Sequence, residues 1–406
     1  MESHIQEKGE EVREINMRIL TLAYLVSVLA TVTASVPIAE QQMVMQVHEL
    51  IREKQVLNMK NRSILEFHKK LVEIPSISDD EMGATYYLKD FLEKAGLTVE
   101  LQEVDRGGRN VYAYKGKKRD NRVLLTSHID TVPPFLPYKV KGSRIYGRGS
   151  CDAKASVASM VFTYLDLVER QLVEEGDLAL LFVVGEEVNG RGMIKASGEL
   201  GTSWEIGIFG EPTELKLGTG HKGALKADVE VRGIASHSGY PELGISATEI
   251  LIPFLQRLLK LDFPSSDVLG NTTLNIGRID AGVAANVIPP YAKAECILRI
   301  AQDLHMAQSL LEDVAQDFNN LTLNITHAVE PQYVDYDVKG FDTIALSYFT
   351  DIPNMAQKLK KRYLYGPGSI LVAHGDHEYI EIADLFEATR GYERLVIHSL
   401  KQLKAY

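Results

Sequence analysis

Apolar and polar residues follow two regular patterns along the first half of this chain, and together they predict alternating strands and helices. Short apolar runs of the kind found in strands occur at 97–104, 110–116, 122–130, 177–184 and 204–210. Apolar residues recur at helical spacing at 63–73, 81–95 and 155–172. This alternation indicates an α/β layered domain with a mainly parallel sheet flanked by helices.

The pattern changes near residue 220. From there the chain reads as strand, helix, two strands, helix and strand, at 222–233, 247–261, 272–282, 292–301, 305–320 and 321–329. That order is typical of a ferredoxin-like α+β domain. Beyond residue 331 the first pattern returns. We therefore expect a smaller domain, 220–330, inserted into a larger one made of 60–219 and 331–406.

The first 39 residues read as a leader. Residues 19–34 are apolar or small and uncharged, and they follow Met17 and Arg18. This run is short for a membrane span and suits the apolar region of a secretory signal, with cleavage after Ala34 or Ala39. The sixteen residues before Met17 carry five glutamates, which a signal peptide would not. Either Met17 is the true start, or the segment is an uncleaved anchor; a buried helix of the globular domain is the third alternative.

Four N-x-[ST] sequons agree with secretion. They offer candidate glycosylation sites at Asn61, Asn271, Asn320 and Asn324. We expect an extracellular protein, or a membrane-anchored one if the leader is retained.

Charge and cysteine content exclude some functions. The formal net charge is −11, and no cluster of Lys and Arg offers a basic face, which argues against a nucleic-acid partner. Cys151 and Cys296 are the only cysteines, and no CxxC motif exists for zinc or redox chemistry. They are either two thiols or one disulfide.

Polar residues collect where the predicted strands of the larger domain end. These residues are His128, Asp130, Asp152, Glu186, Glu187, Glu211 and His374. Taken alone, each of these residues could instead be a structural histidine, a helix N-cap or part of a solvated turn. In open α/β sheets, however, sites lie beyond the carboxyl ends of the strands. Imidazole and carboxylate ligands together suit zinc, with cobalt or manganese as substitutes, and their number suffices for two ions that share one carboxylate.

These segments resemble the M20 family of metallopeptidases. This family groups acetylornithine deacetylase, succinyl-diaminopimelate desuccinylase, aminoacylase and glutamate carboxypeptidase. The resemblance covers about 64–400 and rests on SHIDTVP, GRGSCDAK, GEE and GEPTE, with the fungal secreted carboxypeptidases as the most similar group. It implies a dizinc catalytic domain and an inserted domain, the lid, that contributes to dimerisation. Ala155 stands where many members have glycine.

The resemblance also implies roles for single residues. His128 and Glu211 would bind one ion, Glu187 and His374 the other, and Asp152 both. Asp130 would orient the imidazole of His128, and Glu186 would act as general base. Four further residues would contact the substrate: His237 at the oxyanion, from the partner subunit in some relatives, then Asn286 and Arg299 at a carboxylate, and Gly366 in a substrate loop.

The sequence leaves three functions open. The resemblance implies a secreted zinc metallopeptidase, similar to carboxypeptidases, that uses a metal-activated water to hydrolyse a peptide or N-acyl amide bond next to a free carboxylate. An N-acyl-amino-acid deacylase such as acetylornithine deacetylase is the alternative enzyme. A binding module that has lost catalysis would be expected to lack the base or the shared ligand, and both Glu186 and Asp152 are present.

Overall fold

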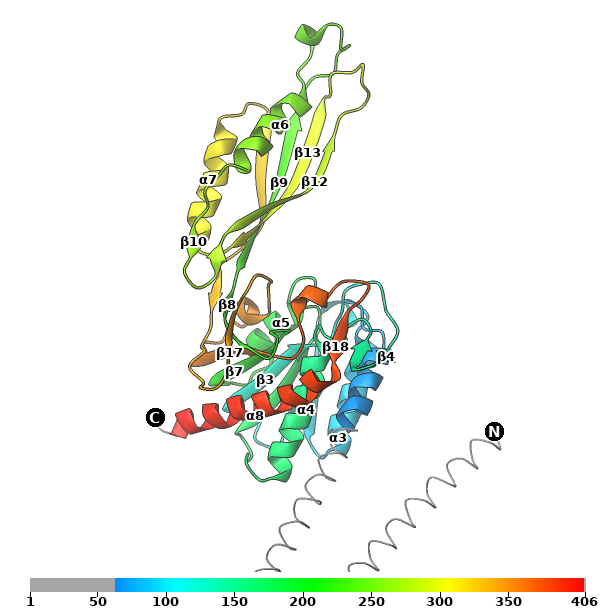
Figure 1. The fold of residues 1–406 in the computed structure, drawn as a ribbon, viewed down its shortest axis with the longest axis vertical. Coiled ribbons are helices and arrows are strands. Elements are labelled where there is room, and N and C mark those ends of the chain that lie inside the picture. Colours follow the sequence, from blue (N-terminus) through cyan, green and yellow to red (C-terminus); the bar gives the residue numbers. More distant parts are fainter. Residues whose placement is uncertain (1–62, 405–406) are drawn as a thin grey trace, which may run out of the picture. The chain divides into compact units, whose positions relative to one another are not determined.

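The computed structural model describes residues 63–404, so the expected leader at 1–39 and the sequon at Asn61 lie outside it. Figure 1 shows the two main sheets of the described part of the chain, one in the larger domain and one in the lid. No helix in that part is long and apolar enough to cross a bilayer.

The larger sheet has six strands within the described residues, in the order β1-β2-β6-β3-β7-β17. Their bounds are Thr98–Glu103 (β1), Arg109–Tyr114 (β2), Leu178–Val183 (β6), Val123–His128 (β3), Ile206–Gly210 (β7) and Lys361–Tyr365 (β17). Strands β6, β3, β7 and β17 are parallel, whereas β2 pairs antiparallel with β6, and β1 pairs antiparallel with β2 at the edge of the sheet. The expectation of a mainly parallel sheet is confirmed.

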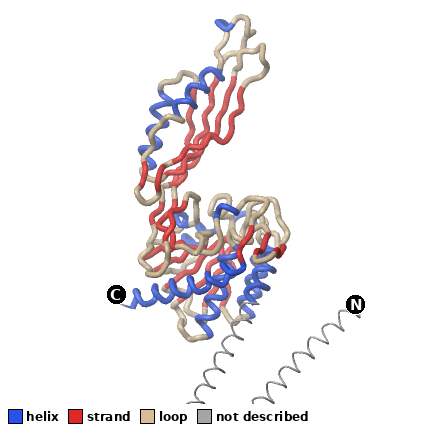
Figure 2. The backbone as a smooth tube through the Cα atoms, viewed as in Figure 1, coloured by secondary structure: helices blue, strands red, loops and turns tan. Residues whose placement is uncertain are grey.

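Helices cover both faces of this sheet, as Figure 2 shows. One face packs on helix 63–73 and on α3 (Met82–Lys94), α4 (Lys154–Glu169) and α8 (Ile382–Lys404). The other face packs on α5 (Arg191–Glu199). Successive residues of β6 point to opposite faces, so Leu180 enters the first core and Leu181 the second. Burial on both sides explains why β6 is apolar throughout.

Three small sheets accompany the two main ones within the described chain. The first combines β8 (Leu217–His221) with β15 (Gln332–Tyr333) and β16 (Thr343–Leu346), and the second combines β5 (Arg144–Tyr146) with β4 (Lys139–Lys141) and β18 (Tyr379–Glu381). The third, β10 (Ser265–Ser266) with β11 (Gly270–Asn271), belongs to the lid segment.

The lid is built on an antiparallel sheet of four strands, in the order β12-β13-β9-β14. The bounds are Gly223–Arg232 (β9), Thr273–Ala281 (β12), Tyr291–Ile300 (β13) and Leu321–Val329 (β14). Helices α6 (Ala247–Leu258) and α7 (Leu304–Gln316) bury one face of it in a separate apolar core. Both helices have a side-chain N-cap, Ser246 for α6 and Asp303 for α7. The opposite face of the sheet carries polar side chains and, within the described chain, no helix.

Candidate metal centre

Three parallel strands deliver the first ligand candidates to one edge of the larger sheet. His128 is the last residue of β3, Glu186 and Glu187 follow β6, and Glu211 follows β7. Because β3 lies between β6 and β7 and runs parallel to both, the three carboxyl ends meet. The adjacent apolar runs of the sequence therefore converge on one polar site.

Asp152 lies at the middle of this site, two residues before α4 begins. Its Oδ1 is 3.1 Å from Nε2 of His128, and its Oδ2 is 3.2 Å from Nε2 of His374. One carboxylate thus faces an imidazole with each of its oxygens. This is the geometry that a ligand shared by two cations needs.

Each imidazole also has a glutamate of its own. Nε2 of His374 is 3.0 Å from Oε2 of Glu187, and Nε2 of His128 is 3.9 Å from Oε2 of Glu211. Ligand atoms of His128, Asp152 and Glu187 all lie within 4.8 Å of one another. The structure therefore forms two half-sites around Asp152, His128 with Glu211 and His374 with Glu187.

Asp130 fixes the turn that carries the two neighbouring glutamates. Its Oδ1 accepts the backbone N–H of Glu186 at 3.1 Å, and its Oδ2 accepts that of Glu187 at 3.2 Å. Oδ2 also accepts the hydroxyl of Ser78 at 2.7 Å. The Nδ1 atom of His128 is nearer to the carbonyl oxygen of Asp130, at 3.0 Å, than to its carboxylate, at 3.5 Å. Asp130 thus contacts His128 mainly through its backbone and the Glu186–Glu187 turn through its side chain.

The carboxylates are crowded: Glu211 is buried, and Glu186 and Glu187 are half-buried. Burial, with the mutual repulsion of neighbouring carboxylates, raises the pKa of Glu186, Glu187 and Glu211. Hydrogen bonds to Asp152 and Glu187 raise the pKa of His374 to about 10. Among the described residues, no lysine or arginine forms an ion pair with these three glutamates. Divalent cations fit this donor set, because they would supply the missing positive charge and displace the protons.

A cavity of about 640 Å³ opens onto the site. Its walls include the ligand candidates Asp152, Glu187, Glu211 and His374, and also Arg299 from strand β13 of the lid. The structure thus places Arg299 in the same cavity as the metal-ligand candidates.

His237 and Asn286 lie together elsewhere on the lid. His237 forms a β-bridge with Val287, and the backbone N–H of Ser238 donates to the carbonyl of Asn286 at 3.1 Å. Both residues are exposed, and neither lines the cavity of its own chain.

Gly366, immediately after β17, packs against the backbone of Glu211. A Cβ at this position would lie 2.4 Å from the carbonyl oxygen of Glu211, so only glycine fits. Its N–H donates to Oγ1 of Thr213 at 2.9 Å. Gly366 does not line the cavity.

Asn271, Asn320 and Asn324 are exposed residues of the lid domain. Cys151 and Cys296 are both buried and free.

Sequence reasoning missed two residues at the site, Asp351 and Glu378. Asp351 is a buried carboxylate within the electrostatic reach of Glu186, and burial raises its pKa to about 7. Glu378 accepts the backbone N–H groups of Cys151 and Asp152, at 3.1 and 3.2 Å. The proximity of Glu378 to His374 in sequence is the only hint that could have indicated it.

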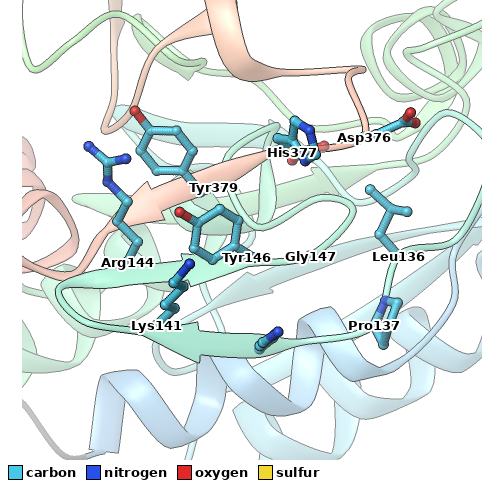
Figure 3. A pocket seen from close by; sticks show the side chains of 11 residues that line it. Leu136, Pro137, Lys141, Arg144, Tyr146, Gly147, Asp376, His377 and Tyr379 are labelled. Atoms are coloured by element: carbon cyan, nitrogen blue, oxygen red, sulfur yellow. The ribbon is translucent and has the colours of Figure 1, made fainter.

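A second hollow, of about 520 Å³, is lined in part by Glu378. Figure 3 shows its other side chains, among them Arg144 and Tyr146 from β5 and Tyr379 from β18. Arg144 is already paired with Glu381 and lies over the ring of Tyr379. None of the ligand candidates lines this second hollow.

Known proteins are similar to this chain in sequence. Residues 219–326 match the family model of the peptidase dimerisation domain. The chain is 48% identical over 342 residues to a peptidase M20 domain-containing protein of Schizosaccharomyces pombe, an alignment that covers 84% of this chain and 85% of the relative. It is 43% identical over 383 residues to a probable carboxypeptidase of Aspergillus flavus, over 83% of this chain and 90% of the relative.

Solved structures share the fold. A tripeptidase of Staphylococcus aureus superposes with a TM-score of 0.71 at 20% identity, over 84% of this chain and 99% of the other. The YXEP protein of Bacillus subtilis, a dinuclear metal binding peptidase of the M20 family, superposes with a TM-score of 0.62 at 18% identity, over 85% and 99%.

Proposed function

The chain belongs to the M20 family of metallopeptidases, and from this premise we propose that it is a secreted, zinc-dependent carboxypeptidase. The reaction is hydrolysis of a peptide or N-acyl amide bond next to a free carboxylate. The observation that carries the proposal is the position of Asp152 between two histidines, each with its own glutamate.

His128, Asp152 and Glu211 would hold one zinc ion, and Asp152, Glu187 and His374 the other. When bound, the two ions would supply Lewis-acid activation of water and of the scissile carbonyl. Carboxylate and imidazole donors would accept cobalt or manganese as well.

Glu186 performs the proton transfers. It adjoins Glu187 in the turn held by Asp130, and its side chain lines the cavity. Burial raises the pKa of Glu186, which suits a carboxylate that accepts a proton from the attacking water and delivers it to the leaving amine. Arg299 holds the free carboxylate of the substrate with its planar guanidinium.

The active protein is a homodimer in this proposal. The match of the lid to a peptidase dimerisation domain supports it. The exposure of His237 and Asn286, outside the cavity of their own chain, supports a role at the partner's site.

Metal content and a substrate screen test the enzyme proposal. Protein purified without chelator and supplied with zinc should contain about two zinc ions per chain by elemental analysis. Dipeptides and N-acyl amino acids are then compared as substrates, with Asp152→Asn as the inactive control. Trace metal and no hydrolysis would overturn the proposal, whereas hydrolysis of simple N-acyl amino acids alone would favour the deacylase alternative.

Secretion is tested separately. It rests on the apolar run at 19–34 and on the three exposed sequons of the lid. Mass spectrometry of the native protein should find a mature N-terminus at residue 35 or 40 in the culture medium. An intact N-terminus on protein found only inside cells would contradict secretion.

A further inference from the structure

The lid presents a basic and acid-free wall to the metal-site cavity. Six lid residues line the cavity: Ala224, Lys226, Ile297, Arg299, Thr326 and His327. They lie on strands β9, β13 and β14. The acids that line the cavity are metal-ligand candidates or the base, and all of them come from the larger domain.

Lys226 and Arg299 are diagonal neighbours on this wall. Arg299 pairs in register with Ala224, two residues before Lys226, and Lys226 pairs with Ile297, two residues before Arg299. Alternate residues of a strand share a face, so both side chains extend from the face opposite α6 and α7. Diagonal neighbours of this kind have Cα atoms about 7–8 Å apart, so two long side chains can reach one small molecule.

Neither cation has an acidic partner among the described residues. Lys293, on the same face of β13, is by contrast 3.4 Å from a carboxylate oxygen of Asp228 and 3.1 Å from one of Glu295. Lys293, which lies outside the cavity, is therefore paired with acids. Lys226 and Arg299, which line the cavity, are not.

The charges of the cavity can be counted, on the basis of the proposed function. Asp152, Glu186, Glu187 and Glu211 can carry four negative charges, which two divalent ions would balance. Lys226 and Arg299 then remain as two uncompensated positive charges. One substrate carboxylate satisfies Arg299, and Lys226 remains available to a second anionic group.

We propose that the enzyme prefers substrates whose C-terminal residue is acidic. Arg299 binds the α-carboxylate of that residue, and Lys226 binds its side-chain carboxylate. Lys226 is exposed and partly solvated, so the selectivity is moderate and is weakened by salt.

The test compares two substrates of equal shape, hippuryl-glutamate and hippuryl-glutamine. Zinc-loaded wild-type protein should show a kcat/KM about three- to ten-fold higher for the glutamate substrate. Lys226→Gln should abolish this ratio, mainly by slowing cleavage of the glutamate substrate. The matched control, Lys293→Gln, makes the same charge change on the same sheet face outside the cavity and should keep the ratio.

Equal kcat/KM values for the two substrates, or a ratio that survives Lys226→Gln, would overturn the inference. A preference for a carboxylate on the acyl side, with succinyl-alanine cleaved faster than either hippuryl substrate, would also overturn it.

A binding experiment separates this inference from the proposed function. Calorimetry of the zinc-loaded protein with L-glutamate and with L-glutamine measures product affinity without turnover. Tighter binding of glutamate that is lost in Lys226→Gln supports the inference even where no peptide is cleaved, and equal binding of the two amino acids refutes it. Absence of hydrolysis alone counts against the proposed function.

Discussion

Arg148 and Glu378 form a buried ion pair, 2.7 Å between Nη1 and Oε2, that joins the two sides of the candidate metal centre. The guanidinium also donates to the carbonyl oxygens of His374 and Gly375, at 3.3 and 3.2 Å. The other oxygen of Glu378 accepts the backbone N–H of Asp152 at 3.2 Å. The pair therefore holds the backbone of the shared ligand and that of the second histidine in one network.

Arg148→Lys should weaken metal binding more than its conservative chemistry suggests. One ammonium cannot reach the set of acceptors that the planar guanidinium reaches, so His374 and Asp152 lose their common support. We expect zinc affinity to fall about 10-fold or more, measured by competition with a chromophoric chelator.

The matched control is Arg144→Lys. Arg144 is exposed and pairs with Glu381 on the surface, so the same change there should leave zinc affinity unaltered. If both variants bind zinc as the wild type does, the Arg148–Glu378 pair serves stability alone.

Three ligand candidates and the proposed base could be located from the sequence because each follows an apolar strand. The buried strand β6 is apolar throughout, so the first carboxylates after it, Glu186 and Glu187, stand out. The same logic indicated His128 and Glu211, at the ends of the neighbouring strands. Asp152 and His374 do not follow a strand: Asp152 lies in the turn before α4, and His374 follows a 3-10 turn, Ile370–Val372, so the expected strand end is wrong there.

The supporting residues could not be located in this way. Arg148 and Glu378 are separated by 230 residues, and neither lies in a periodic pattern. Lys226 occupies an ordinary polar position in an alternating strand, and only the pairing of β9 with β13 shows that it shares a cavity with Arg299. Contacts between distant segments depend on packing, which residue spacing does not encode.

Glu186→Gln and Glu187→Gln should fail in different ways. Glu187 lies 3.0 Å from His374 and belongs to a half-site, whereas the side chain of Glu186 has no such partner among the described residues. Glu186→Gln should keep its zinc while turnover falls about 10²-fold or more, because the proton acceptor is gone. Glu187→Gln should lose zinc on dialysis, since an amide is a poorer ligand. The reverse result, read from zinc content and kcat, would exchange the two roles.

His68 should make the fold sensitive to mild acid. It is fully buried, its Nε2 lies 3.0 Å from the carbonyl of Ser150, and its Nδ1 has no partner. Burial lowers its pKa from 6.5 to about 4. Between these values the unfolded chain binds a proton that the folded chain does not, so stability falls as pH falls from 6.5 to 4. The loss attributable to His68 is up to roughly 3 kcal/mol.

His68→Gln retains an amide donor for Ser150 but does not titrate. Its free energy of unfolding, measured in urea at several pH values between 7 and 4, should fall less steeply than that of the wild type. His305→Gln, at an exposed histidine of α7, is the control and should follow the wild-type slope. Parallel curves for all three proteins would contradict the assignment.

His237 is exposed and lies outside the cavity of its own chain, so we expect it to serve the site of a second copy. His237→Ala and Glu186→Gln should each be inactive as homodimers. In a heterodimer of the two, one site combines Glu186 from the first chain with His237 from the second and is complete. Mixing the variants in equal amounts and allowing subunits to exchange should restore about a quarter of wild-type activity.

Recovery must depend on exchange, so chains cross-linked before mixing should stay inactive. A fully active His237→Ala protein would remove His237 from the reaction. If the variants exchange subunits but recover no activity, His237 acts within its own chain, and the lid must close to bring it there.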